Sequence, residues 1–219
     1  MKQERAARTR QVLVRVAGEE FAHRGFESAS LRRISARAGV SYGGLHHHFA
    51  GKQDLARAVV SEAVAILRDE VCAAPGPGEG AGATRFPALQ GLIDATCRLM
   101  ARLDQDAVVQ AGFALSLGTA NPDLGEDLRE QWRCWVEGAL AEAERARELG
   151  EGVRGADVAA AVVAATVGFE VLAAGDRSWL KPDVTARFWQ LILPRIAAPA
   201  MVDGLLHGGL VAVDVEPAS

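Results

Sequence analysis

The chain has 219 residues, of which 49% are hydrophobic and 24% are charged, and its net charge is −4. This composition excludes a disordered chain, and its many helix-forming residues and few alternating β-branched runs predict an all-α fold. Residues 1–52 carry ten Lys/Arg against four Asp/Glu, a net +6, so the remainder is acidic. A basic head on an acidic body indicates that only the head meets an anion.

The first predicted element is a long helix over residues 4–24. Leu13, Ala17 and Phe21 recur every four residues and give it one apolar face. Gly25 follows this periodic stretch and is expected to end the helix.

Two short helices joined by a tight turn are expected next. Ser28 or Ser30 is positioned to cap the first, "LRRISARA", and Gly39 to end it. Ser41 is positioned to cap the second, "YGGLHHHF", and Lys52 opens a longer helix. Two short helices after a longer one, with glycine in the turn, form the helix-turn-helix pattern.

The rest of the chain also predicts helices. The segment from Ala73 to Ala83 is rich in Gly, Pro and Ala and is expected to be a linker. The last two helices have broad apolar faces, which predict that two copies of the chain meet there as a four-helix bundle. The expected helices cover residues 85–103, 106–118, 122–149, 155–175 and 182–197.

The second short helix has the residues that a recognition helix needs. Small and polar residues at its start allow close approach to base edges in the major groove of DNA: Ser41, Tyr42, Gly43 and Gly44. Other side chains are expected at phosphates or base edges: Arg32, Arg33, His46, His48 and Lys52. His47 faces DNA or solvent.

The three consecutive histidines, His46 to His48, are not expected to bind a metal. Successive helical residues point about 100° apart, so these side chains cannot converge on one ion. No metal and no other cofactor is therefore predicted.

The head resembles the DNA-binding domain of the TetR family of regulators. The match spans about forty residues and carries the family motifs at Phe21…Gly25-Phe26, Ala38-Gly39-Val40-Ser41, Leu45…His48-Phe49 and Lys52…Leu55. The resemblance implies that His48 and Lys52 contact phosphates and that the chain is a homodimer. It also implies a helix-turn-helix domain over residues 1–52 and a larger helical ligand-binding and dimerisation domain over 53–208. The end of the chain, residues 209–219, is expected to be a flexible tail. His46 departs from the pattern, because the family usually has Tyr there, and this leaves the operator sequence open.

The body is similar to the γ-butyrolactone receptor branch of that family at Val108…Ala111-Gly112, Trp132-Arg133 and Val167-Gly168. The similarity implies that Trp132 lies against a bound lactone. Large apolar residues among many small ones also indicate a cavity, to which Thr166 and Gln131 add polar groups. The expected apolar lining is Phe113, Met100, Leu117, Val163 and Phe169, each of which is equally consistent with ordinary core packing.

We therefore expect a repressor that leaves a palindromic operator when it binds a small hydrophobic ligand, either a γ-butyrolactone-like autoregulator or an antibiotic-related metabolite. The alternative is a DNA-binding dimer with a vestigial pocket. An enzyme is not expected, because no nucleophile–base pair, paired carboxylates or phosphate-binding loop is present.

A cytoplasmic location is expected as well. The N-terminus lacks the apolar centre of a signal peptide, and no uninterrupted apolar run reaches the roughly 18 residues of a membrane span. The three cysteines, Cys72, Cys97 and Cys134, are widely spaced, which argues against a disulfide framework.

Overall fold

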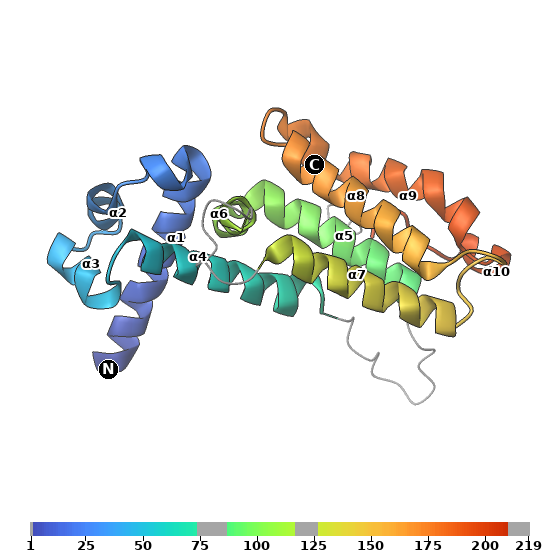
Figure 1. Ribbon diagram of the computed structural model, residues 1–219, viewed down its shortest axis with the longest axis horizontal. Coiled ribbons are helices and arrows are strands. Elements are labelled where there is room, and N and C mark those ends of the chain that lie inside the picture. The colour runs from blue at the N-terminus through green and yellow to red at the C-terminus, as the bar shows by residue number, and fades with distance from the viewer. Residues whose placement is uncertain (1, 74–86, 117–126, 210–219) are drawn as a thin grey trace, which may run out of the picture. The chain divides into compact units, whose positions relative to one another are not determined.

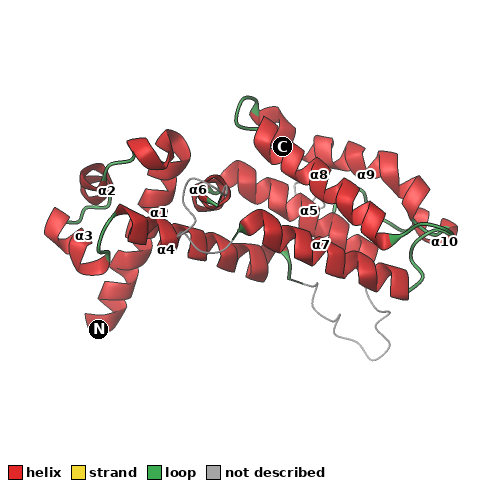
Figure 2. Cartoon of the chain, viewed as in Figure 1, coloured by secondary structure: helices red, strands yellow, loops and turns green. Residues whose placement is uncertain are grey.

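The computed structural model describes residues 2–73, 87–116 and 127–209, and within these ranges it holds helices and turns but no β-strand (Figures 1 and 2). The expected all-α fold is thus confirmed. The chain divides into two compact units: Met1–Arg68 with Gln105–Gln131, and Asp69–Asp104 with Trp132–Ser219. Most of the expected linker, Leu117 and nearly all of the expected tail lie outside the described residues.

The N-terminal unit begins with the three predicted helices. They are α1 (Lys2–Ser28), α2 (Leu31–Arg37) and α3 (Tyr42–His48), and α4 (Lys52–Ile66) follows them and leads into a π-helical turn, Leu67–Val71. Helical geometry breaks at Gly25, whose φ of 72° lies in the left-handed region that glycine tolerates, so α1 ends in effect where the sequence predicted. A common core, buried to 2% exposure or less, joins these helices: Leu13, Phe21, Ile34, Leu45, Phe49, Leu55 and Val59.

Helix α6 (Ala107–Leu115) also belongs to the N-terminal unit, because it packs against both α1 and α4. Two glycines permit this close packing. A Cβ added to Gly18 would lie 2.9 Å from Val108 Cγ2, and a Cβ added to Gly112 would lie 2.4 Å from Ala63 Cβ. The compact unit is therefore larger than the domain of residues 1–52 that the sequence suggested.

The C-terminal unit contains α5 (Ala88–Gln105) and most of α7 (Leu128–Arg145), followed by α8 (Gly155–Leu172), the 3-10 helix η4 (Arg177–Leu180), α9 (Pro182–Ile196) and α10 (Pro199–Val202) (Figure 1). The sequence predicted the longer helices but neither η4 nor α10. Pro182 stands in the first turn of α9 as expected.

Two contacts between distant residues close this unit. The Glu148 carboxylate accepts hydrogen bonds from the backbone N–H groups of Ala88 and Leu89, at 3.0 and 2.9 Å, and so caps the start of α5. The buried Gln90 side chain exchanges two hydrogen bonds with the backbone of Leu206. Residues up to the expected tail are thereby held to α5.

Helix α8 is unusually apolar and poorly covered. Its 18 residues have a mean hydropathy of 1.7, and 28% of them are buried. By length and composition alone this helix is able to cross a membrane. The same features also fit a helix that packs against a second copy of the chain.

Candidate DNA-binding and ligand-binding sites

Helix α3 is held at both ends by its own sequence. The Ser41 hydroxyl accepts a hydrogen bond from the Gly44 N–H at 3.0 Å, which confirms the predicted cap. Leu45 and Phe49 are buried, as expected, and anchor the helix in the core. The Ser30 side chain, in contrast, makes no cap hydrogen bond at the start of α2.

The two glycines of α3 have different roles. Nothing lies within 4 Å of a Cβ added at Gly43, which is exposed. A Cβ at Gly44 would lie 2.9 Å from Val40 Cγ1 and 3.1 Å from Ser41 Oγ. Gly44 is therefore required for the fold of the turn. Gly43 has no side chain to project from the exposed face of α3, so another molecule can approach the backbone closely there.

The exposed side of α2 and α3 carries a row of three interacting side chains, Arg32, Tyr42 and His46. The Arg32 guanidinium lies over the Tyr42 ring at 5.3 Å, and the Tyr42 and His46 rings meet edge to face at 4.6 Å. Tyr42 is 43% exposed although it is aromatic. His47 is exposed too, and His48 is half-buried with its ring 5.5 Å from that of His47. Cationic, aromatic and imidazole groups on one exposed helix face suit contact with DNA.

Two residues that are predicted to bind DNA also have partners within the protein. Arg33 Nη1 lies 3.3 Å from the carboxylate of Glu20. The Lys52 ammonium donates to the backbone carbonyls of Phe26 and Glu27 at 2.8 and 3.0 Å. Their side chains therefore already have binding partners within the head.

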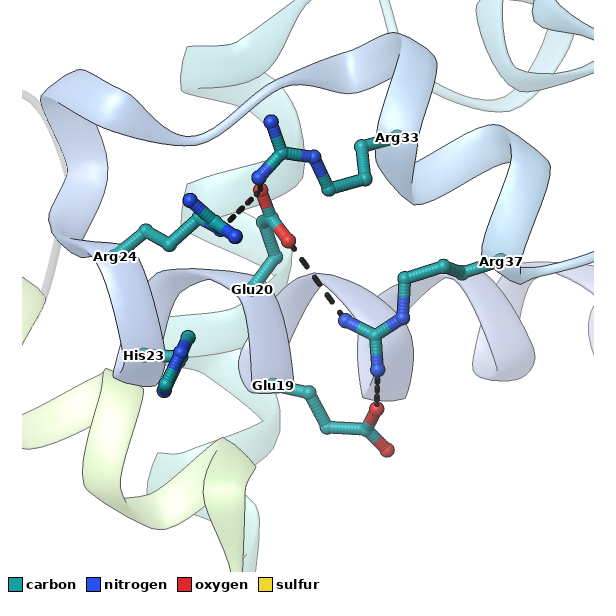
Figure 3. Close-up of a pocket in the computed structure, with 6 residues that line it drawn as sticks. All are labelled: Glu19, Glu20, His23, Arg24, Arg33 and Arg37. Carbon is teal, nitrogen blue, oxygen red and sulfur yellow. Dashed lines mark hydrogen bonds and ion pairs between the residues drawn. The ribbon is translucent and has the colours of Figure 1, made fainter.

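The Arg33 contact belongs to a charged pocket between α1 and α2, shown in Figure 3, with a volume of about 460 Å³. Glu20 is 2% exposed, and its carboxylate faces three guanidinium groups, those of Arg24, Arg33 and Arg37, at 3.3 to 3.7 Å. A buried carboxylate needs such partners to offset its desolvation. The cluster thus fastens α2 to α1, a role that the sequence did not reveal because each arginine by itself fits a solvated helix face.

In the C-terminal unit, Trp132 and Thr166, both expected at the ligand site, lie together. The Trp132 side chain is completely buried, and its Nε1–H donates to Thr166 Oγ1 at 2.9 Å. The Thr166 hydroxyl in turn donates to the Val162 carbonyl oxygen at 2.9 Å. The Trp135 ring stacks on that of Trp132 with centroids 5.4 Å apart. The hydrogen bond joins α7 to α8, whereas the stack lies within α7.

The other residues expected to line a ligand site are divided between the units. Met100 is buried in the C-terminal unit, where Val163 and Phe169 are half-buried. Phe113 and Gln131 belong to the N-terminal unit. There the Arg129 guanidinium donates to the Phe113 carbonyl oxygen at 2.9 Å and lies over the Phe113 ring.

Two further polar residues, which the sequence analysis had not selected, lie in the core of the C-terminal unit. Thr185 and Trp189 are one turn apart on α9 and completely buried. Neither Thr185 Oγ1 nor Trp189 Nε1 has a hydrogen-bond partner among the described residues. Native proteins rarely leave buried polar groups unpaired, because the lost hydration is costly. The four-residue spacing was visible in the sequence, but the missing partners were not.

Side chains that bind metals do not cluster in the described part of the chain. Among the residues that the structure describes, no group of three His, Cys, Asp or Glu side chains is placed to hold a metal ion. Cys72 and Cys97 are partly buried, and desolvation raises the pKa of each thiol to about 12. Such thiols are poor nucleophiles and poor metal ligands at neutral pH.

Comparison with known proteins explains this combination of a helix-turn-helix head and a helical body. Residues 13–59, which include α2 and α3, match the model for bacterial regulatory proteins of the tetR family. The chain is 29% identical over 211 residues to the A-factor receptor protein of Streptomyces griseus, covering 92% of this chain and 68% of that protein. The chain belongs to the TetR family.

Solved structures place it near one branch of the TetR family. The protein CprB from Streptomyces coelicolor, in complex with its biological operator sequence, is 28% identical with a TM-score of 0.71, over 91% of this chain and 94% of that one. A γ-butyrolactone receptor described as ArpA-like is 25% identical with a TM-score of 0.69, over 91% and 93%. TetR-family proteins are transcriptional regulators rather than enzymes, so this chain is a regulator related to the γ-butyrolactone receptors.

Proposed function

We propose that this TetR-family regulator is a homodimeric repressor that leaves a palindromic operator when a small hydrophobic ligand binds its C-terminal unit. The observation that carries the proposal is the exposed row of Arg32, Tyr42 and His46 on a capped helix, in a chain whose second unit buries a tryptophan–threonine pair. The ligand is a γ-butyrolactone-like autoregulator or an antibiotic-related metabolite.

On the DNA side, the start of α3 enters the major groove, with Ser41, Tyr42, Gly43 and Gly44 nearest the base edges. Arg32, His46, His47 and His48 meet phosphates or further base edges. The net charge of +6 on residues 1–52 supports this assignment, because attraction to phosphates supplies much of the affinity for DNA. Arg33 follows Arg32 on α2, is exposed, and pairs with Glu20.

On the ligand side, the core of the C-terminal unit offers apolar surface with few polar groups. Trp132 and Thr166 supply one polar pair, and Thr185 with Trp189 supply an unpaired hydroxyl and an unpaired indole N–H. A lactone with an alkyl chain fits this chemistry, because its carbonyl oxygen accepts a hydrogen bond and its chain is apolar. The names of the A-factor receptor and the γ-butyrolactone receptor support the same class of ligand.

Dimer formation is supported by the surface of the last long helices. Leu191 on α9 is 76% exposed, and Val171 and Leu172 at the end of α8 are 54% and 49% exposed. Large apolar side chains with this much exposure suit contact with another protein surface. A second copy that packs α8 and α9 against their equivalents would cover them and would present two recognition helices to a palindrome.

Release from DNA requires that the ligand bind the DNA-free form more tightly than the DNA-bound form. A coupling free energy of about 1–3 kcal/mol weakens DNA binding roughly 5- to 150-fold. The chain passes from the C-terminal to the N-terminal unit at Asp104–Gln105 and returns at Gln131–Trp132. Trp132, the proposed ligand contact, is therefore the first residue of the C-terminal unit after the chain leaves the DNA-binding unit.

A second candidate is a DNA-binding dimer without an inducer. It is favoured by the complete burial of Trp132 and by the mutual hydrogen bond with Thr166, which leave neither group in need of a ligand. In this case the core is closed, and regulation occurs through the abundance of the protein or through a partner.

The two candidates are distinguished by titrating the protein with a series of alkyl-substituted γ-butyrolactones while recording tryptophan fluorescence. The ligand-gated repressor predicts a saturable change that Trp132→Phe diminishes. A signal that stays constant across the series, together with operator binding that no lactone weakens, would favour the vestigial pocket.

A further inference from the structure

Lys52 connects two turns of the DNA-binding head, the turn after α3 and the turn between α1 and α2. It is the first residue of α4 and directly follows the turn after α3. Its side chain reaches the other turn, residues 26–30, where the chain passes from α1 to α2. Gly25, with its φ of 72°, breaks α1 just before that turn, within which the Ala29 N–H donates to the Phe26 carbonyl oxygen at 3.3 Å.

The Lys52 ammonium donates hydrogen bonds to backbone carbonyl oxygens of this turn. Nζ lies 2.8 Å from the carbonyl oxygen of Phe26, 3.0 Å from that of Glu27 and 3.4 Å from that of Ala29. An ammonium group has three N–H donors, and three acceptors are present. Nζ also lies 4.6 Å from the centre of the Phe26 ring, within the range of a cation–π interaction.

These contacts connect the turn between α1 and α2 to the start of α4. The Phe26 ring packs at 5.9 Å from the ring of the buried Phe21, so the turn that Lys52 holds is itself attached to the core. The turn after α3 is fixed as well, since the Asp54 carboxylate accepts a hydrogen bond from the Ala50 N–H at 3.1 Å. Lys52 therefore ties the start of α2 to the end of α3.

We propose that Lys52 is a positioning residue, which supports DNA binding by holding the α1–α2 turn against α4 and not by contacting a phosphate. The inference rests on the proposed function only in taking the head to bind DNA. It departs from what the family resemblance implied for this residue. A lysine with three carbonyl partners would have to give up hydrogen bonds before it could reach a phosphate.

The salt dependence of DNA binding separates the two roles. A phosphate contact releases counterions, so its loss reduces the slope of log K against log salt concentration by about 0.9 per contact, or about 1.8 for a dimer that loses two. A positioning residue touches no phosphate, and its loss lowers affinity at every salt concentration while the slope stays the same.

The experiment compares wild type, Lys52→Met, Lys52→Arg and the control Lys181→Met by fluorescence anisotropy, at 50 to 300 mM salt, with a labelled duplex from upstream of the protein's own gene. Lys181 is a lysine of the C-terminal unit, paired with Asp104, and its change measures the effect of removing one remote positive charge. Circular dichroism at the assay temperature establishes that each variant is folded.

We expect Lys52→Met to weaken binding on the order of tenfold with an unchanged slope, and Lys52→Arg to recover most of the affinity because a guanidinium also donates to carbonyl groups. A slope reduced by about 1.8 would overturn the inference in favour of a phosphate contact. Unchanged affinity in folded Lys52→Met would overturn it too. Failure of the wild-type protein to bind the duplex would instead refute the proposed function on which the inference rests.

Discussion

Replacing Gly112 by alanine tests how closely α6 is fitted to α4 within the DNA-binding unit. The new Cβ would lie 2.4 Å from Ala63 Cβ and 3.4 Å from Leu128 Cδ2. Carbon atoms normally approach no closer than about 3.5 Å, so the two helices must separate by about 1 Å. Ala63 Cβ is fixed to the α4 backbone, which prevents relief by a change of rotamer.

The size of the effect follows from two opposing terms. Overpacking costs about 1–3 kcal/mol, and a rigid contact belongs to the upper half of that range. Alanine recovers up to about 1 kcal/mol relative to glycine within a helix. We therefore expect Gly112→Ala to lower the free energy of unfolding by about 1–2 kcal/mol, which corresponds to a fall of roughly 2–8 °C in Tm for a chain of this size.

Thermal and chemical denaturation followed by circular dichroism measure this change. Gly138 in α7 is the matched control, because nothing lies within 4 Å of an added Cβ and the residue is exposed. Gly138→Ala should stabilise the protein by about 0.5–1 kcal/mol. Adding Ala63→Gly to Gly112→Ala should restore part of the loss, since it removes the clashing methyl group. Equal stabilisation by Gly112→Ala and Gly138→Ala would refute the packing argument.

Three further predictions concern the C-terminal unit. Trp132→Phe removes one buried hydrogen bond and should cost about 1 kcal/mol of stability, while DNA binding persists and ligand release weakens; a normal response to ligand would place the site elsewhere. Thr185→Val removes an unpaired buried hydroxyl and should raise Tm by a few degrees while it weakens ligand binding, so a lower Tm would show that the hydroxyl has a partner. At pH 8, iodoacetamide should modify the exposed Cys134 well before Cys72 and Cys97, whose thiol pKa values of about 12 keep them protonated in the native protein until strongly alkaline pH; mass spectrometry that finds equal rates would contradict that order.

Local features of the head were predictable from the sequence because neighbouring residues encode them. Gly39 has a φ of 67° and ends α2, and Ser41 caps α3 with its own side chain. Each of these depends on the backbone preference or reach of a single residue. The buried anchors Leu45 and Phe49 follow from helical periodicity alone.

Features that depend on distant residues were not predictable. The cap on α5 comes from Glu148. Its carboxylate accepts hydrogen bonds from the N–H groups of Ala88 and Leu89, which lie 60 and 59 residues earlier in the chain. Periodicity marks an apolar face but does not name its partner, so the packing of α6 against α1 and α4 was missed. Lys52 was predicted to contact a phosphate, and its three carbonyl acceptors, which lie 23 to 26 residues earlier in the chain, were not predicted.

The candidate ligand site shows the same division. Trp132 and Thr166, 34 residues apart, were both selected, whereas the hydrogen bond between them was not. Thr185 and Trp189 became notable only when the structure left their polar atoms buried and unpaired. A missing partner is a property of the whole core, and no pattern of neighbouring residues expresses it.

The most direct test of the central claim is an anisotropy titration of the protein on the palindromic DNA upstream of its own gene, repeated with an organic extract of the source organism's culture. The ligand-gated repressor predicts tight binding that the extract reverses, with Trp132→Phe bound to DNA but less responsive. Tight binding that the extract leaves unchanged would contradict ligand gating, and absence of binding would contradict the assignment of α3 as a recognition helix.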